Sequence, residues 1–184
     1  MIREPNLVLI GFMATGKSTV GWDCAKILGL RYRDSDRLVE RRAGKSVSAI
    51  FAEDGEAEFR NLEASAIKTL AAANPIVLST GGGAPMNPLN VERLRRTGYI
   101  ILLWAEPEAV LSRIGNAASR PLLNSCDESP EERVRNLLAI RKPVYSAAAD
   151  EVINTTSLTR SEAVDRVVAA YRHGVTMTRF RSPV

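Results

Sequence analysis

Four residues near the N-terminus are spaced as G-x-x-x-x-G-K-[ST], the pattern of a loop that binds phosphate groups; they are Gly11, Gly16, Lys17 and Ser18. Glycines let the backbone turn tightly and approach an anion closely. Lys17 can place its charge between the β- and γ-phosphates of a nucleotide, and the Ser18 hydroxyl can ligate Mg²⁺. A chance glycine-rich turn is the alternative interpretation.

The flanking sequence favours the phosphate-binding interpretation. The apolar run 7–10 is typical of a buried strand, and residues 19–28 have helical character. The motif requires this order of strand, loop and helix. We therefore predict a nucleoside triphosphate site at this loop.

Two acidic residues, Asp34 and Asp36, follow a second expected strand over residues 30–34. If the strand persists, the two carboxylates point to opposite sides, so that one can face a metal and the other a substrate. An ordinary turn with Asp36 as the N-cap of a helix over 37–43 is the alternative. Spacing alone favours that capping interpretation.

Arg60 lies at the edge of the apolar stripe of a helix expected over residues 56–72. Glu56 and Glu63, four residues before it and three after it, can hold its guanidinium group in place. A surface salt bridge without function is the alternative.

Three successive glycines, Gly81, Gly82 and Gly83, end a strand expected over residues 75–80. Glycines at the end of a buried strand cost backbone entropy, so they indicate a place where a ligand touches the backbone. A flexible turn is the competing interpretation, although the Ala84-Pro85 pair that follows argues against it.

A segment of small and polar residues over 115–124 carries one basic side chain, Arg120. It separates two expected helices, the first over 107–114 and the second from about 129 to 145 or 148, which carries Arg141. Such a segment can be a lid that excludes water and brings a charge to a transferred phosphoryl group, or it can be a plain loop.

The whole pattern alternates strands with helices and predicts an α/β fold. The expected strands cover residues 7–10, 30–34, 75–80, 99–104 and 151–154. Further helices are expected over residues 46–52, 87–96 and 161–171, with a loose tail over about 174–184. Such alternation indicates one parallel sheet covered on both faces, with the ligand site at the carboxyl ends of the strands.

Composition limits the classes of protein that the chain can belong to. Its 184 residues are 45% hydrophobic and 25% charged, as in an ordinary globular domain. The net charge of +4 suits small anionic substrates, and because the basic residues are dispersed we expect no nucleic-acid partner. No apolar run of membrane-spanning length or signal-peptide type occurs, so we expect a cytoplasmic protein without membrane contact.

The cysteines and the histidine offer no catalytic or metal-binding pattern. Cys24 is expected in the core, Cys126 as an incidental loop thiol and His173 as a solvated residue near the C-terminus.

Six segments together resemble shikimate kinase; they read GFMATGKST, DSD, FAEDGEAEFRNLE, STGGGAP, SRPLL and RKPVY. The resemblance covers nearly the whole chain in the right order. It implies a P-loop, nucleoside-monophosphate-kinase-like three-layer fold with a five-stranded parallel sheet. The same resemblance implies a single kinase domain over 1–184, a small helical substrate-binding region over about 34–62 and a lid over about 113–126.

The resemblance also implies an activity: ATP-dependent phosphorylation of the 3-hydroxyl of shikimate by a monomer that requires Mg²⁺. The implied ATP contacts are Gly11, Ala14, Thr15, Gly16, Lys17, Ser18, Thr19, Arg113 and Arg120, and residues 154–160 are expected near adenine. The implied metal ligands are Ser18 and Asp34. The implied substrate contacts are Asp36, Arg60, Gly81, Gly82, Gly83 and Arg141. The implied catalytic residues are Lys17, Asp36 and Arg120.

One residue departs from the family pattern, because Ala14 stands where the loop often has glycine. If that position has φ > 0, alanine there costs about 1 kcal/mol. Two other functions remain open at this point. They are a related kinase of the gluconate type and a catalytically weakened regulatory protein that binds a nucleotide.

Overall fold

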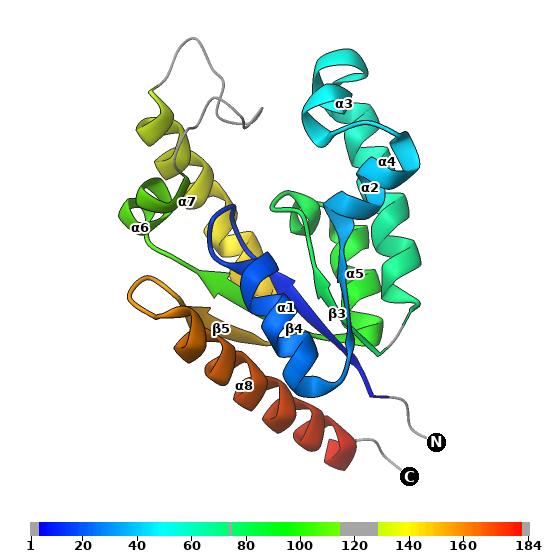
Figure 1. The fold of residues 1–184 in the computed structure, drawn as a ribbon, viewed down its shortest axis with the longest axis vertical. Coiled ribbons are helices and arrows are strands. Elements are labelled where there is room, and N and C mark those ends of the chain that lie inside the picture. The colour runs from blue at the N-terminus through cyan, green and yellow to red at the C-terminus, as the bar shows by residue number, and fades with distance from the viewer. Residues whose placement is uncertain (1–3, 74, 115–128, 182–184) are drawn as a thin grey trace.

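A five-stranded parallel sheet runs through the middle of the computed structural model, which describes residues 4–73, 75–114 and 129–181 (Figure 1). Its strands are β1 (Asn6–Ile10), β2 (Arg31–Asp34), β3 (Ile76–Ser79), β4 (Gly98–Trp104) and β5 (Glu151–Asn154). Their order in the sheet is β2-β3-β1-β4-β5, and every neighbouring pair is parallel. The predicted parallel α/β fold is confirmed.

Helices cover both faces of this sheet. The helices of the described residues are α1 (Lys17–Leu28), α2 (Ser35–Ala43), α3 (Val47–Glu53), α4 (Gly55–Ala71), the 3₁₀ turn η1 (Ala84–Met86), α5 (Pro88–Thr97), α6 (Pro107–Ile114), α7 (Pro130–Ala148) and α8 (Arg160–Arg181). Helices α1 and α8 lie side by side on one face, whereas α4, α5 and α7 pack against the other (Figure 1).

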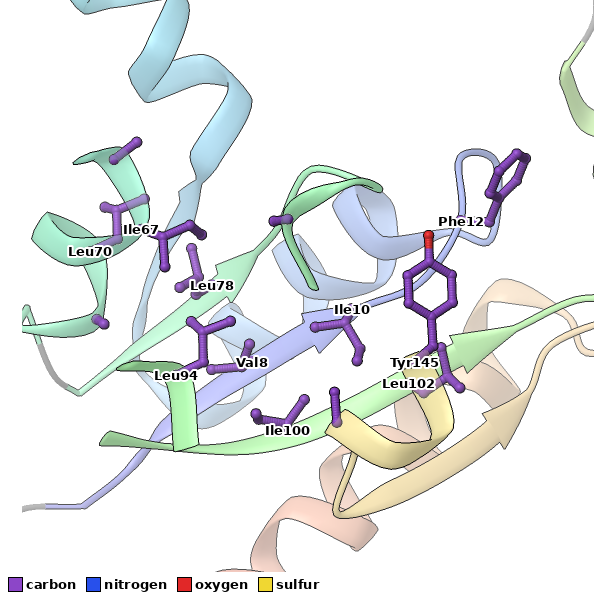
Figure 2. Close-up of a cluster of buried hydrophobic side chains, with 14 of the residues drawn as sticks. Val8, Ile10, Phe12, Ile67, Leu70, Leu78, Leu94, Ile100, Leu102 and Tyr145 are labelled. Atoms are coloured by element: carbon purple, nitrogen blue, oxygen red, sulfur yellow. The ribbon is translucent and has the colours of Figure 1, made fainter. Parts of the chain in front are cut away.

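The alternation of side chains along β1 shows why three layers form. Leu7 and Leu9 enter the apolar cluster beneath α1 and α8. Val8 and Ile10 point the other way and enter a second cluster with side chains of α4, α5 and α7 (Figure 2). A strand that is buried on both faces reads as a continuous apolar run, as this one does.

Helix α2 corrects the expectation that Asp36 is an N-cap. The cap is Asp34, whose carboxylate accepts hydrogen bonds from the backbone N–H groups of Asp36 and Arg37. Because β2 ends at Asp34 and α2 starts at once, Asp36 falls in the first helical turn. Its side chain is therefore available to the site.

Helix α8 corrects the expected loose tail. The helix continues through residue 181, because Gly174 and Val175 are buried against the body of the protein. A Cβ atom at Gly174 would run into the ring of Tyr99, so the glycine lets this part of the helix pack closely on β4.

Some predictions fall on residues outside the described ranges, among them Arg120, most of the expected lid and Cys126. Cys24 is buried, as expected, and His173 is exposed. None of the described helices is both long enough and apolar enough to cross a bilayer.

Candidate active site

The loop between β1 and α1 has the geometry of an anion site. Gly11 and Gly16 have φ of 138° and 98°, conformations that favour glycine. Gly11 also leaves no room for a Cβ atom, which would collide with the carbonyl oxygen of Leu103. Helix α1 begins at Lys17 without a side-chain cap or an acidic residue in its first turn, so its N-terminal N–H groups can bind an anion.

Lys17 is held inside this loop. Its side chain is buried, and Nζ donates a hydrogen bond to the carbonyl oxygen of Phe12 over 2.6 Å. Thr15 Oγ1 donates to the same carbonyl over 2.9 Å. The Thr15 side chain therefore shapes the loop, rather than lining the phosphate cavity.

Ala14 adopts φ of 60°, so the position where the family often has glycine is in the left-handed region. Ala14 is the one non-glycine residue with a positive φ in the part of the chain that the structure describes. Alanine at this position therefore carries the conformational cost of about 1 kcal/mol that a positive φ imposes on a residue with a Cβ atom.

A cavity of about 310 Å³ lies beside the loop and contains most of the expected substrate residues. Its polar lining comes mainly from Asp36, Arg60, Glu63, Gly81, Gly82, Gly83 and Arg141, and its apolar lining from Met13, Val47, Phe51 and Phe59. We call it the acceptor cavity. A second cavity, the phosphate cavity, is lined by Lys17, Ser18 and Asp34 among others. Both cavities are lined by Met13, Asp36 and Gly82, so they meet at these three residues.

Arg60 is fixed by the two glutamates that the sequence indicated. Its guanidinium donates to Glu63 over 2.9 Å and to Glu56 over 2.8 Å. It also lies over the ring of Phe59, at 5.1 Å from the ring centre. The Glu63 side chain is only 2% exposed, so this pair is not the surface salt bridge of the alternative interpretation.

Arg141 reaches the acceptor cavity from α7. Its side chain is buried, lies over the ring of Phe12 at 5.5 Å from the ring centre and approaches the Gly82 carbonyl oxygen at 3.5 Å. The Tyr145 hydroxyl, one helical turn later, donates to the same carbonyl over 2.5 Å. Figure 2 shows Tyr145 at the edge of the apolar cluster, close to Phe12. Helix α7 thereby fixes both Arg141 and the backbone of the glycine segment.

The glycine segment passes between side chains that leave no space for a methyl group at two positions. A Cβ atom on Gly81 would lie 2.5 Å from Asp36 Oδ1 and 2.7 Å from Glu63 Oε1. A Cβ atom on Gly83 would overlap the Arg60 guanidinium. At Gly82 the nearest atom would be 3.6 Å away, an ordinary contact. Gly81 and Gly83 are therefore required by the close packing of charged groups, a reason that the sequence did not reveal.

Asp36 has an unusual environment for a carboxylate. Burial raises its pKa to about 6, the negative charges of Asp34 and Glu63 add to the rise, and Lys17 opposes it. Burial also raises the pKa of Glu63, against the effect of Arg60. A carboxylate with a raised pKa holds a proton more strongly than a free one, which suits a group that must accept a proton from a substrate hydroxyl.

Ser18 and Asp34 bring two oxygen ligands to the phosphate cavity. The Ser18 hydroxyl donates to Asp34 Oδ2 over 3.4 Å. Within the described residues, no group of three or more His, Cys, Asp or Glu side chains could hold a metal alone. The pair fits a cation that prefers oxygen and takes its remaining ligands from phosphates and water, as Mg²⁺ does.

A third cavity lies on the other side of the loop and suits a nucleoside. It is lined by Ala14, Thr15, Gly16, Thr19, Arg113, Thr155 and residues 158–160, with Val20 and Ala163. Arg113 donates to the carbonyl oxygens of Thr155 and Thr156 over 2.7 and 3.0 Å, which fixes its guanidinium at the rim. The expected ATP residues that lie within the described ranges therefore belong to the loop or line one of the two cavities beside it. Gly11 lines neither cavity and contributes through the close approach of the loop to Leu103.

Sequence reasoning missed three contributors to the site. Glu63 was expected only as a partner of Arg60, yet it also lines the acceptor cavity, and its Oε1 has no hydrogen-bond partner among the residues that the structure describes. The Tyr145 contact with Gly82 and the Thr155 contact with the Thr15 carbonyl were not anticipated. The spacing of Tyr145 after Arg141, one turn along the same helix, was the available signal for the first of these contacts.

The parallel sheet, the phosphate loop at the end of β1 and the adjoining cavity with two arginines define a P-loop kinase with a small anionic acceptor. The sequence model of the shikimate kinase family matches residues 13–172. The chain belongs to the shikimate kinase family.

Named relatives agree over almost the whole chain. The chain is 45% identical to the shikimate kinase of Caldanaerobacter subterraneus, over 90% of this chain and 95% of that protein. It is 40% identical to that of Methylococcus capsulatus, over 97% and 99% of the two chains.

Solved structures agree as well. The shikimate kinase of Acinetobacter baumannii in complex with shikimate superposes with a TM-score of 0.85 at 35% identity, over 94% of each chain. A gluconokinase from Sinorhizobium meliloti has a TM-score of 0.61 at 14% identity, over 98% of this chain and 99% of that one, and supports the fold alone.

Proposed function

We propose that this chain transfers the γ-phosphoryl group of ATP to the 3-hydroxyl of shikimate, giving shikimate 3-phosphate and ADP. One observation carries the proposal: the acceptor cavity, with Asp36, Arg60 and Arg141, meets the phosphate cavity of Lys17 at Asp36. Membership of the shikimate kinase family supports it.

The two arginines suit the carboxylate of the acceptor. Arg60 enters the cavity from α4 and Arg141 from α7, and each is fixed by contacts that do not depend on a ligand. Guanidinium groups bind carboxylates by paired, charge-assisted hydrogen bonds. We assign the two residues, with the backbone of Gly81–Gly83, to binding and orienting the acid ring.

Asp36 is assigned to the reacting hydroxyl. Phosphoryl transfer has a loose transition state, so alignment and charge neutralisation contribute more than strong base catalysis. The Asp36 carboxylate accepts a hydrogen bond from the 3-hydroxyl and takes its proton as the new O–P bond forms. Lys17 and the N-terminal N–H groups of α1 bind the phosphate oxygens and balance their charge.

We assign Ser18 and Asp34 to holding Mg²⁺ with the nucleotide. The two oxygen ligands fit this ion, and the family's ATP-dependent reaction typically needs a divalent metal. When bound, the ion supplies charge neutralisation at the β- and γ-phosphates. Asp34 also caps α2, so the same side chain links the metal site to the start of the substrate-binding helices.

The remaining assignments rest on resemblance. Arg120, in the S-R-P-L-L segment, is proposed to reach the transferred phosphoryl group from a lid, and it lies outside the described residues. Arg113 and the third cavity are proposed to hold the nucleoside. We also propose that the protein is a monomer, and light scattering coupled to gel filtration would test this oligomeric state. We propose the cytoplasm as its location, because ATP is abundant there.

A panel of acceptors tests the proposed function. ADP release would be measured with shikimate, with the methyl ester of shikimate and with D-gluconate. We expect turnover with shikimate, a large rise in KM with the ester because its carboxylate is masked, and little or no turnover with gluconate. Preference for gluconate would support the gluconate-type alternative, and ATP binding without turnover of any acceptor would support a regulatory protein.

A further inference from the structure

The carboxylate of Asp34 is held at both oxygens. Its Oδ1 accepts hydrogen bonds from the N–H groups of Asp36 and Arg37 over 3.0 and 3.3 Å. Its Oδ2 accepts from the Tyr32 hydroxyl over 3.0 Å and from the Ser18 hydroxyl over 3.4 Å. The phenol of Tyr32 is therefore the nearer partner of the oxygen that faces Ser18.

The ring of Tyr32 is fixed by the fold. Tyr32 lies on β2 in register with Val77, and its ring fills the space that Gly21 leaves on α1. A Cβ atom at Gly21 would lie 3.0 Å from Cε2 of this ring. Trp22 packs against the ring edge to face, with a centre-to-centre distance of 5.7 Å and an angle of 79° between the planes. The packing of the ring therefore fixes the phenol, which holds Asp34 Oδ2 while the two backbone N–H groups of α2 hold Oδ1.

The hydroxyl adds nothing to this packing that a phenylalanine would lack. The contacts with Gly21 and Trp22 are made by the ring, whereas the hydroxyl donates its hydrogen bond to Asp34 and has the Ser18 and Ser79 hydroxyls beside it. A half-buried phenol that donates a hydrogen bond to a carboxylate at the phosphate cavity is placed to orient that carboxylate.

We propose that the Tyr32 hydroxyl is a positioning group for the metal–nucleotide site: it aims Asp34 Oδ2 at Ser18, so that a divalent cation meets two oxygen ligands already in place. The inference rests on the proposed assignment of Ser18 and Asp34 to the metal. The Ser18 hydroxyl donates its hydrogen bond to Asp34, so the lone pairs of its oxygen face the cation. The partners of ligating groups tune metal affinity in this way, with effects of about 10-fold or more.

The test is the affinity of the ADP complex for Mn²⁺, measured by electron paramagnetic resonance, because this readout does not depend on turnover. Tyr32→Phe keeps the ring packing and removes the hydroxyl. We expect its Kd for Mn²⁺ to rise about ten-fold, with the Kd for ADP without metal and the KM for shikimate unchanged.

Tyr99→Phe is the matched control, since it removes a phenol whose partner is Glu151, at the opposite end of the sheet from the loop. Its Kd for Mn²⁺ should equal that of the wild type.

Asp34→Asn separates this inference from the proposed function. If Asp34→Asn weakens Mn²⁺ binding while Tyr32→Phe does not, the metal assignment stands and the positioning role is wrong. If Asp34→Asn leaves Mn²⁺ binding unchanged, the metal assignment and the inference fail together. Loss of metal-free ADP binding in Tyr32→Phe would show a general structural role and would also overturn the inference.

Discussion

Asp36 shows how the environment of one residue decides its chemistry. It lies in the first turn of α2, between the phosphate and acceptor cavities, with Asp34 and Glu63 as acidic neighbours. Its carboxyl group can take a proton from the substrate hydroxyl only when it is ionised. Burial and the neighbouring negative charges raise the pKa of Asp36. The same environment therefore makes the carboxylate a stronger proton acceptor and limits the pH range in which it is ionised.

The pKa of Asp36 predicts the pH profile of the reaction. Because burial raises this pKa to about 6, the carboxylate is lost as the pH falls through that value. We expect log(kcat/KM) for shikimate to be level near pH 7.5 to 8 and to fall with a slope of about one unit per pH unit below about pH 6. Steady-state kinetics from pH 5 to 8 give the profile, with the unfolding temperature followed as a control. A level profile down to pH 5 would contradict the role of Asp36.

Ala14 offers a test of backbone strain in the phosphate loop. Its φ of 60° disfavours a residue with a Cβ atom, so Ala14→Gly should raise the free energy of unfolding by about 1 kcal/mol. Urea unfolding measures the change. Ala139→Gly, at an exposed position in the middle of α7, is the control with the opposite expected sign, a loss of about 1 kcal/mol. A loss of stability in Ala14→Gly would show that loop entropy outweighs the strain.

The glycine segment between β3 and η1 is an element whose function depends on missing side chains. It carries the backbone past Asp36, Glu63 and Arg60 at distances that a methyl group at Gly81 or Gly83 does not permit. Tyr145 and Arg141 of α7 fix its central carbonyl group. The segment therefore lies in contact with both helices that supply the arginines, α4 and α7.

Substitutions at neighbouring glycines separate this packing role from flexibility. In Gly83→Ala the new methyl group displaces the Arg60 guanidinium, so we expect the KM for shikimate to rise about 10- to 100-fold, the equivalent of one lost hydrogen bond to a charged group. Gly82→Ala should raise the KM less, because its methyl group makes only ordinary contacts. Equal effects of the two substitutions would indicate that backbone freedom, and not space for Arg60, explains the glycines.

The last turns of α8 are a second element set by close packing. In Gly174→Ala the added methyl group collides with the Tyr99 ring, so the free energy of unfolding should fall by about 1 to 3 kcal/mol. Thr176→Ala, an exposed position on the same helix, should change it by less than about 0.5 kcal/mol. Chemical unfolding compares the two variants. An unchanged Gly174→Ala protein would mean that this end of α8 does not pack as described.

The sequence predicted the five-stranded sheet well because its signals were local. The apolar runs, the glycine-lysine loop and the spacing of Glu56, Arg60 and Glu63 each lie within a few residues of chain, and their placement followed from the rule that parallel strands end at one edge. Two predictions were wrong: Asp36 was expected as the N-cap of α2, where the structure has Asp34, and α8 was expected to end earlier than it does. The first depends on where β2 ends, and the second on the contact between Gly174 and Tyr99.

The parts of the site that sequence did not predict come from contacts between distant segments. Glu63 meets Asp36 across Gly81, Tyr145 reaches Gly82 from a helix more than sixty residues away, and Thr155 binds the loop at Thr15. No single stretch of sequence records these pairings, because they arise only when the helices pack on the sheet. Positions in local motifs were therefore predictable, whereas orienting groups that come from distant segments were not.

We infer that one cleft brings the triphosphate and the acid ring together for transfer. The most direct test of this inference is a single turnover with enzyme in excess over ATP and with shikimate present, followed by ³¹P nuclear magnetic resonance of the quenched mixture. We expect the γ-phosphorus signal of ATP to be replaced by that of shikimate 3-phosphate, with one ADP formed for each product molecule. ADP accompanied by inorganic phosphate, or ATP left intact beside bound shikimate, would contradict it.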